Sequence, residues 1–403
     1  MSTKQLYRAF GCSHYSPVDC HQEDGVFVLE MECPREKDRC SGCGSRDVIR
    51  RGSRQRQVVA PPLALQTTKL LINVPRLECR NCGRVLQAAT PNVVPGCNYT
   101  RAFARLVVSL RPMMTIKDIA MYLGVSESMI RGIDKRYLKR NFGRPKLKRL
   151  KVLAIDEIYI GKAKKFLTIV IDWTTGAIVF VGEGKGEKAL KSFWKRLQGS
   201  GAKIEAVATD MSSAYFAAVQ KNLPNAKLVF DRFHIVKLMN EKLDQLRREV
   251  QNEADVMLKK TIKGLRWLLL KHSDNLDPAR NEAQRLQDAL ELNRSLHIGY
   301  YLKEDLAQIW TQGSKTSAAI FLDDWCRRAR ATGIRVLQTM ANTLQGHRTG
   351  ILNWYDYPIS SGPMEGVNNK IGALQRAAYG YRDQQYFILK LFALHEAKFK
   401  FLV

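Results

Sequence analysis

The sequence predicts a multidomain α/β protein, in which a mixed-sheet core with an all-helical insertion follows two small N-terminal domains. Two Cys-x-x-Cys-Gly motifs stand in the first hundred residues. Strand-like apolar runs alternate with helical stretches between 151 and 240, and the segment from 241 to 350 is helical with little strand signal. These observations predict five parts, with the boundaries 1–99, 100–150, 151–240, 241–350 and 351–403.

The charge of the chain favours a polyanionic partner. Its 403 residues include 65 Lys and Arg against 38 Asp and Glu, a net charge of +27. Such an excess is typical of proteins that hold nucleic acid. A membrane partner is disfavoured, because no apolar run approaches the roughly 20 residues that span a bilayer. The N-terminal stretch also lacks the apolar region of a signal peptide, so we expect a soluble, intracellular protein.

The two cysteine motifs predict a zinc ribbon. Each motif turns two thiolates toward one point, and the glycine that follows permits the tight geometry. Strand-like segments at 57–60 and 68–74, split by Pro61 and Pro62, fill the gap between the motifs. Free or redox-active thiols are the alternative, and Cys33 could replace one ligand. The predicted ligands of one structural Zn²⁺ are Cys40, Cys43, Cys79 and Cys82.

Arginines crowd the first half of this ribbon. A cluster of like charges is often only a solvated face, but this one agrees in sign with the whole chain. We therefore expect Arg50, Arg51 and Arg54 to contact DNA phosphates.

Residues 100–131 predict one helix at 100–110 followed by two helices that are joined by a sharp turn. Apolar residues follow a helical period from 100 to 110, and a second helical segment begins at 115. Ala120 allows close approach of two helices, Gly124 makes the turn, and Ser126 caps the next helix. The pattern is that of a helix-turn-helix, with an ordinary helical hairpin as the alternative. The basic run that continues to Lys151 predicts a linker or a phosphate-tracking arm. The expected DNA-contacting residues are Ser126, Ser128, Arg131, Lys135 and Arg136.

The core segment predicts a mixed sheet with helices on its faces. Strands are expected at 152–156, 166–172, 177–181, 204–209 and 227–230, and helices at 187–197, 214–221 and from 231 onward. A turn at Thr174–Gly176 makes the second and third strands an antiparallel hairpin. This order matches an RNase H-like plan, which by analogy is a nuclease scaffold. In the insertion we expect Trp267, Trp310 and Trp325 to lie in a core.

Three carboxylates stand where a metal site would need them. Asp156 and Asp210 each follow an apolar run, so each is expected at the tip of a buried strand. Glu365 follows the Gly362–Pro363 break and is expected in the first turn of a helix. Glu157 is the alternative to Asp156, but neighbours on a strand face opposite ways. Three such carboxylates can share two Mg²⁺ or Mn²⁺ ions, which would clamp the attacking and leaving oxygens of a phosphodiester.

The ordered set of motifs resembles the ISL3 family of DDE transposases from bacterial insertion sequences. The motifs are the two cysteine pairs, the helix-turn-helix, and the segments at 154–157, 208–212, 230–234 and 360–368. The resemblance runs across nearly the whole chain and implies a metal-binding triad of Asp156, Asp210 and Glu365. It also implies an accessory motif at Asp231 and His234, although His234 could equally cap a helix or fill a core. Asn368, one turn after Glu365, is a further accessory candidate.

Together these features predict an enzyme that binds the terminal inverted repeats of a mobile element and cuts and transfers its strands. The resemblance implies double-stranded DNA as partner, two or more copies of the chain on that DNA, and a bacterial cytoplasmic, nucleoid-associated location. The alternative is a DNA-binding regulator without catalysis, which would use the ribbon and the helix-turn-helix alone. The three carboxylates in their expected contexts favour the enzyme.

Overall fold

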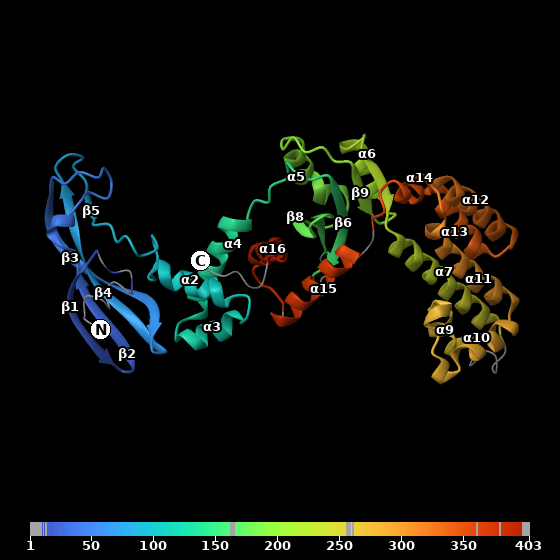
Figure 1. Ribbon diagram of the computed structural model, residues 1–403, viewed down its shortest axis with the longest axis horizontal. Coiled ribbons are helices and arrows are strands. Elements are labelled where there is room, and N and C mark those ends of the chain that lie inside the picture. Colours follow the sequence, from blue (N-terminus) through green and yellow to red (C-terminus); the bar gives the residue numbers. More distant parts are fainter. Residues whose placement is uncertain are drawn as a thin grey trace. The chain divides into compact units, whose positions relative to one another are not determined.

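The chain forms two compact units in a computed structural model (Figure 1). The first unit comprises the residues up to Arg144 together with Glu396, and the second runs from Pro145 to His395. The structure describes residues 10, 12, 14–161, 166–254, 259, 262–359, 362–378 and 380–396. Within these residues, no helix has both the length and the apolar character needed to cross a bilayer.

A five-stranded mixed sheet forms the first part of the first unit. Its strands are β1 (Ser16–Glu23), β2 (Val26–Glu32), β3 (Val48–Leu63), β4 (Gln66–Cys79) and β5 (Val85–Gln87), with a short helical turn η1 (Arg35–Lys37) after β2. The order is β1-β2-β4-β3, with β5 also paired to β4. β3 and β4 run antiparallel between the two cysteine motifs, as the ribbon prediction requires. One face of the sheet is buried around Leu29, Val58 and Ile72.

The prediction that Pro61 and Pro62 end a strand is wrong. β3 continues through both prolines to Leu63, and the turn lies instead at Ala64 and Leu65, whose φ angles are 47° and 67°. β3 is the edge strand of the sheet. Because an edge strand has one row of unpaired N–H groups, it tolerates residues that lack this donor.

Three helices follow the sheet in the same unit. They are α2 (Arg101–Leu110), α3 (Ile116–Leu123) and α4 (Glu127–Phe142). Thr115 and Asp118 form a capping box at the start of α3, and Ser126 caps α4 by accepting from the N–H of Met129. Gly124 ends α3 with φ of 62°, the left-handed conformation that glycine adopts without strain. The basic run predicted as a linker is therefore helical as far as Phe142, and only the residues after it connect the two units.

The second unit contains the predicted mixed sheet. Its strands are β6 (Val152–Tyr159), β7 (Phe166–Asp172), β8 (Ala177–Glu183), β9 (Ala206–Thr209) and β10 (Lys227–Phe230), in the order β10-β9-β6-β7-β8. β6, β7 and β8 are antiparallel, whereas β9 and β10 run parallel to β6. The connecting helices are α5 (Glu187–Gln198), α6 (Ser213–Asn222) and α7 (Arg232–Glu253). The predicted alternation of strands and helices is confirmed.

In the described residues, the chain between β10 and the last two helices is helical throughout, as predicted. After α7 come α9 (Arg266–Leu270), η2 (Ser273–Asn275), η3 (Pro278–Arg280), α10 (Glu282–Glu291), α11 (Arg294–Ala307), η4 (Gln308–Thr311), α12 (Lys315–Ala331), α13 (Arg335–Gly346), α14 (Arg348–Leu352) and η5 (Asn353–Tyr355). The last helices are α15 (Gly362–Ala377) and α16 (Gln384–Phe392). The boundary predicted after residue 240 falls inside α7, which passes from the sheet into the insertion without a break.

Two of the three tryptophans in the insertion are buried, and one is not. Trp310 and Trp325 have exposed fractions of 5% and 0%, whereas that of Trp267 is 68%. The prediction for Trp267 is wrong because the short helix α9 turns Leu268 and Leu269 toward the core, so that Trp267 lies on the exposed side of the helix.

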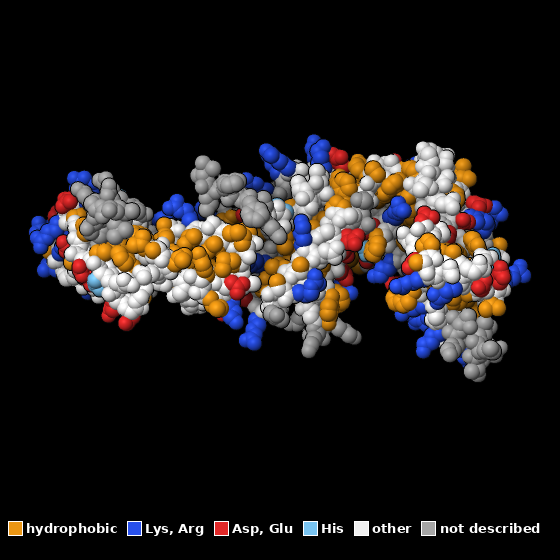
Figure 2. All heavy atoms as spheres, turned by 60° about the horizontal axis from the view of Figure 1, so that its bottom comes forward, with side chains coloured by type: hydrophobic (Ala, Val, Ile, Leu, Met, Phe, Trp, Pro, Cys, Tyr) orange, Lys and Arg blue, Asp and Glu red, His pale blue; other side chains and the backbone are white. Residues whose placement is uncertain are grey.

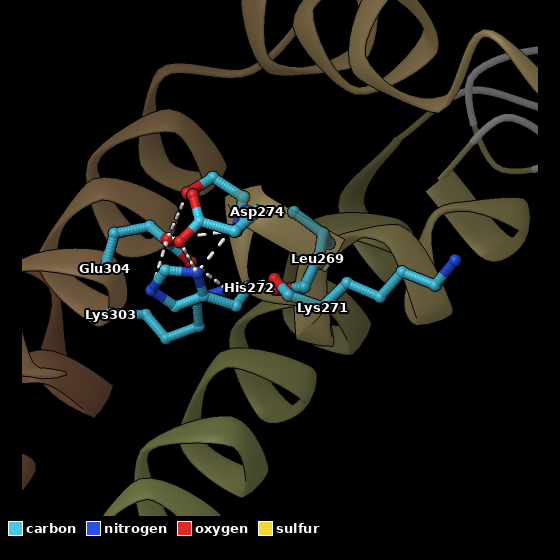
Figure 3. A network of polar contacts seen from close by, with 7 residues as sticks. Leu269, Lys271, His272, Asp274, Lys303 and Glu304 are labelled. Carbon is cyan, nitrogen blue, oxygen red and sulfur yellow. Dashed lines mark hydrogen bonds and ion pairs between the residues drawn. The ribbon is translucent and has the colours of Figure 1, made fainter. Parts of the chain in front are cut away.

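A buried lysine fixes α9 to α11 (Figure 3). The Lys303 ammonium donates to the carbonyls of Leu269 and Lys271 and pairs with Glu304 at 2.5 Å. Glu304 also accepts from the N–H and hydroxyl of Ser273. The lysine thus satisfies carbonyls at the C-terminal end of α9 that the helix itself leaves without partners.

The end of the insertion packs directly on β10. Gly350 of α14 faces the ring of Phe230, which is itself buried and stacked on His347. A Cβ at Gly350 would overlap this ring. Only glycine therefore allows the approach of α14 to the sheet.

We expect Gly350→Ala to lower the free energy of unfolding by about 1–3 kcal/mol, because overpacking forces backbone shifts in a dense core. Gly346→Ala, at the end of α13, is the matched control, since no atom lies within 4 Å of a Cβ built there. Urea unfolding of both variants measures the difference. Equal stability of the two variants would contradict the described packing of α14 on β10.

Candidate active site

The strand register brings three aspartates to one edge of the second sheet. Ala154 of β6 pairs with Ala208 of β9, so Asp156 and Asp210 each follow this pair by two residues. Thr209 pairs with Phe230 of β10, and the N–H of Asp231 donates to the Thr209 carbonyl at 3.1 Å. Because carboxyl ends of parallel strands meet at one edge, the three aspartates lie at that edge, with Asp210 and Asp231 directly after β9 and β10.

Asp156 is not at the tip of its strand, contrary to prediction. β6 continues through Glu157 to Tyr159 because it stays paired with β7, where Asp156 faces Ile169. Its pairing with β9, however, ends at Ala154. Asp156 therefore lies just beyond the last residue of β6 that pairs with β9. The apolar run in the sequence does not show that β6 stops pairing with β9 before it stops pairing with β7.

Asp156 and Glu157 have different partners. The Asp156 carboxylate accepts from the side-chain amide of Asn368 at 2.8 Å. The Glu157 carboxylate accepts from the Tyr215 hydroxyl at 2.7 Å and pairs with Lys185 at 3.0 Å. This separation agrees with the alternation of side chains along a strand. Nothing in the sequence indicated Tyr215 or Lys185 as partners of Glu157.

Asp210 begins the loop between β9 and α6. It accepts from the N–H of Ser212 at 3.1 Å, and His347 donates through Nε2 to the carbonyl of Met211 at 3.1 Å. Burial raises the pKa of Asp210, and the charges of Glu157 and Asp156 raise it further, against the opposing effects of the Ser212 N–H and His234. Sequence reasoning missed His347, because 136 residues separate it from the loop that it contacts.

The Asp231 and His234 side chains are bonded to each other at the start of α7. One carboxylate oxygen of Asp231 accepts from the N–H of Phe233 at 3.0 Å, which caps the helix. The other accepts from Nδ1 of His234 at 3.1 Å. This bond raises the pKa of His234 most, and the charges of Asp231, Asp156 and Asp210 raise it further, against burial.

Glu365 lies in the first turn of α15, as predicted, and is exposed. It precedes Asn368 by three residues, so both project from one side of the helix. In the described part of the chain, the only group of three or more possible ligands whose atoms lie within 4.8 Å of one another is a cysteine cluster. The structure therefore brings Asp156 and Asp210 to one edge of the sheet and places Asn368 of α15 against Asp156. The carboxylates of Asp156, Asp210 and Glu365 do not all lie within 4.8 Å of one another. Ser360 and Ser361 of the third motif lie outside the described residues.

That cysteine cluster is the predicted one, and it fits a zinc ion. The sulfurs of Cys40 and Cys82 lie 3.7 Å apart, and those of Cys43 and Cys79 lie 3.5 Å apart. Four thiolates around zinc, with bonds of about 2.3 Å, would lie about 3.8 Å apart. Backbone N–H groups of Cys43 and Gly42 lower the pKa of Cys40 to about 6, which favours the thiolate that binds metal. Cys33 is buried but does not belong to the cluster.

The arginines predicted to contact DNA from the ribbon differ in how they are held. Arg50 is bound by Asp38, with a shortest distance of 2.6 Å, and donates to the carbonyl of Cys33. Arg51 pairs with Glu78 at 2.5 Å, while Arg54 lines a polar hollow beside Gln57. Arg50 thus stabilises the ribbon through its own hydrogen bonds. Figure 2 shows Lys and Arg side chains spread over the visible face rather than gathered in one patch.

Four of the five residues predicted to contact DNA from α4 are exposed on or beside this helix: Ser126, Ser128, Arg131 and Arg136. The Ser126 hydroxyl is 3.0 Å from that of Ser128. Arg131 pairs with Glu127 one turn earlier, at 3.4 Å, and Arg136 donates to the carbonyl of Pro95 at 3.5 Å. Lys135 is partly buried on the same helix.

Comparison with known proteins identifies the family. A family model described as "Transposase" and specific to ISL3 elements matches residues 153–391, more than half of the chain. A second model, "zinc-finger of transposase IS204/IS1001/IS1096/IS1165", matches residues 36–82 and includes all four clustered cysteines. The chain belongs to the ISL3 family of DDE transposases.

Curated relatives agree with this assignment. The transposase for insertion sequence element IS1001 of Bordetella parapertussis is 31% identical over 361 residues, which cover 87% of each chain. The transposase for IS1557 of Mycobacterium tuberculosis is 25% identical over 391 residues, covering 90% of this chain and 87% of that one. Among solved structures, the Drosophila P element transposase strand transfer complex matches 73% of this chain and 91% of that chain, with 12% identity. Its TM-score of 0.40 indicates only a distant likeness.

The carboxylate edge of this transposase has the donor chemistry of a divalent-metal site. Oxygen ligands from carboxylates suit hard divalent cations. The side-chain oxygen of Asn368 is buried and has no hydrogen-bond partner among the described residues, next to the carboxylate that its amide contacts. A cation at this edge would stabilise the ionised form of Asp210, whose pKa is raised by burial and further by the neighbouring carboxylates.

We expect the purified transposase to contain about one zinc per chain, and Cys43→Ser to lose most of it, because a closed site of four thiolates does not tolerate removal of one. Elemental analysis of the folded protein measures the metal. Cys20→Ser is the control, since Cys20 lies on β1 outside the cluster. Zinc content that is the same in both variants would contradict the four-cysteine site.

Proposed function

We propose that Asp156, Asp210 and Glu365 are the catalytic carboxylates of this transposase and that they bind two Mg²⁺ ions, with Mn²⁺ as a substitute. The observation that carries the proposal is the parallel register that places Asp156 and Asp210 beside each other at one sheet edge. The hydrogen bond from Asn368 to Asp156 adds support, because Asn368 lies on the helix of Glu365. The alternative ligand Glu157 already binds Tyr215 and Lys185.

The sheet order also supports a nuclease scaffold. Three antiparallel strands followed by two strands parallel to the first, with the first strand central, correspond to the RNase H-like plan. Ligands bind outside the carboxyl ends of such parallel strands, where the aspartates lie. When bound, the two metals would activate a nucleophile and stabilise the leaving oxygen of a phosphodiester. The chain's own contribution is to hold the carboxylates at fixed positions along the edge.

We further propose that α3, Gly124 and α4 act as a helix-turn-helix that recognises DNA. The cap at Ser126 and the left-handed Gly124 give the compact turn that this motif requires. Ser126, Ser128, Arg131, Lys135 and Arg136 are the proposed contacts from this part, and Arg51 and Arg54 those from the ribbon. Arg50 has a smaller role than the sequence suggested, because its guanidinium is bound to both Asp38 and the carbonyl of Cys33 and its side chain is 29% exposed, against 58% for Arg51.

The proposed reaction follows from these parts. The transposase binds the terminal inverted repeats of its insertion sequence and cuts at each end by metal-dependent hydrolysis. The freed 3′ hydroxyl then attacks target DNA. Two or more copies of the chain hold both ends together, since each copy carries one set of carboxylates. The net charge of +27 supplies the affinity for the phosphate backbone.

We expect Asp156→Asn, Asp210→Asn and Glu365→Gln each to bind element ends with unchanged affinity but to cleave them at least about 100-fold more slowly in Mg²⁺. That loss corresponds to about 2.7 kcal/mol of activation free energy. The reason is that each change removes negative charge from the metal site without removing a basic residue that contacts phosphate. Single-turnover cleavage of a labelled end measures the rate.

The matched control for these variants is Glu291→Gln. Glu291 is an exposed residue at the end of α10 and accepts a hydrogen bond from Gln287. This variant should cleave like the wild type. If Glu365→Gln also cleaves at the wild-type rate, Glu365 is not the third carboxylate.

Charge reversal on α4 tests the DNA-binding proposal. The triple change of Arg131, Lys135 and Arg136 to Glu should weaken binding to element ends and reduce the slope of affinity against salt by about one for each lost phosphate contact. Reversal of Lys188, Lys191 and Lys195 on α5 changes the net charge by the same amount and is the control. Binding titrations at several salt concentrations measure both. Equal loss in the two triple variants would show that only the total charge matters, against a specific role of α4.

A further inference from the structure

We propose that His234, oriented by Asp231, donates the proton that the leaving 3′ oxygen needs when an element end is cut. This inference rests on the proposed function, since it places the cut phosphodiester at the edge that carries Asp156 and Asp210. His234 would be a catalytic residue, and Asp231 a residue that positions it. The motif at 231–234 thereby receives a chemical role beside the carboxylates.

The first support is the placement of the pair. Asp231 directly follows β10, which pairs with β9 one residue before Asp210. The backbone bond from Asp231 to Thr209 fixes this alignment at 3.1 Å. His234 lies three residues later, on the first turn of α7, so its ring extends from the helix that begins at the catalytic edge.

The second support is the way in which the Asp231 carboxylate is shared. One oxygen caps α7 at the N–H of Phe233, and the other accepts from Nδ1 of His234. An aspartate with a purely capping role needs only the first of these bonds. The second bond holds the Nδ1 proton and the ring orientation, so that Nε2, which has no partner among the described residues, is the nitrogen that takes up and releases a proton.

The third support is the charge around the ring. The carboxylates that act on His234 are Asp231 from its own helix, Asp156 from β6 and Asp210 after β9. The bond to Asp231 contributes most and favours the protonated imidazolium, which is the form that can donate, and this bond does not depend on the charges of Asp156 and Asp210 that bound cations would offset. A histidine that only fills a core would be fully buried. His234 is instead partly exposed, with 27% of its side-chain surface accessible.

The proposed step balances without an outside reagent. A water oxygen forms a new bond to phosphorus while the bond from phosphorus to the 3′ oxygen breaks. The attacking water gives its proton to solvent, and the departing 3′ oxygen takes the Nε2 proton of His234. The imidazole regains a proton from solvent before a second cut. In strand transfer the neutral imidazole can accept the proton of the attacking 3′ hydroxyl, because the same oxygen then reacts in the reverse sense.

The test replaces the bridging 3′ oxygen at the cut position with sulfur. A thiolate leaves without protonation, since a thiol has a pKa of about 8.5, several units below that of an alcohol. We expect His234→Ala to cut the normal end at least about 100-fold more slowly than the wild type. On the sulfur-containing end, the same ratio of wild-type to variant rate should fall below about tenfold. Comparing ratios removes any effect of sulfur on the metal, because both proteins meet the same substrate.

Further variants separate the possible explanations. Asp231→Asn should show a smaller loss with the same recovery on sulfur, and His297→Ala, which changes a histidine on α11, should show no loss. An equal loss for His234→Ala on both substrates would overturn the proton-donor role. Asp156→Asn is measured alongside: if it is inactive while His234→Ala is fully active, only the proton-donor role fails. If Asp156→Asn remains active, the proposed carboxylate site itself is wrong.

Discussion

The hydrogen-bond register of the three parallel strands β6, β9 and β10 is the constraint on which the candidate site depends. Each strand contributes one aspartate near its carboxyl end, and the pairs Ala154–Ala208 and Thr209–Phe230 set their alignment. A slip of one residue would turn each side chain to the opposite face of the sheet. Consecutive residues of these strands are buried, so both faces of the sheet are covered, and a slip would disrupt the side-chain packing on each face. Packing of the core and placement of the carboxylates are thus one and the same requirement.

The long helical insertion returns to this sheet at defined points. The amide of Asn353 donates to the carbonyl of Leu228 at 2.9 Å, and His347 contacts both the ring of Phe230 and the carbonyl of Met211. These contacts fix the chain shortly before α15. The insertion can therefore separate Asp210 from Glu365 by many residues in sequence while both ends of it remain attached to the strand next to the aspartates. Close packing at Gly350 adds to these contacts, since a Cβ there would overlap the ring of Phe230.

The two candidate metal centres have one physical feature in common. In each, the fold gathers groups that repel one another when ionised: carboxylates at the sheet edge and thiolates in the ribbon. Burial and neighbouring charges raise the pKa of Asp210, whereas backbone N–H groups lower that of Cys40. A cation that binds only the folded arrangement stabilises it by mass action.

The sequence by itself determined the local features. Strand and helix periodicity, capping residues such as Ser126 and the repeated cysteine motif each depend on neighbours in the chain, so the elements and the four-sulfur cluster could be predicted. What depends on distant pairing could not. Only the tertiary structure decided that β3 is an edge strand able to hold two prolines, that Trp267 faces outward, and that Asp156 lies inside β6 rather than at its tip. It also decided that Asn368 contacts Asp156 and that His347 contacts Met211. Contacts between residues more than a hundred positions apart arise from packing and leave no periodic pattern in the sequence.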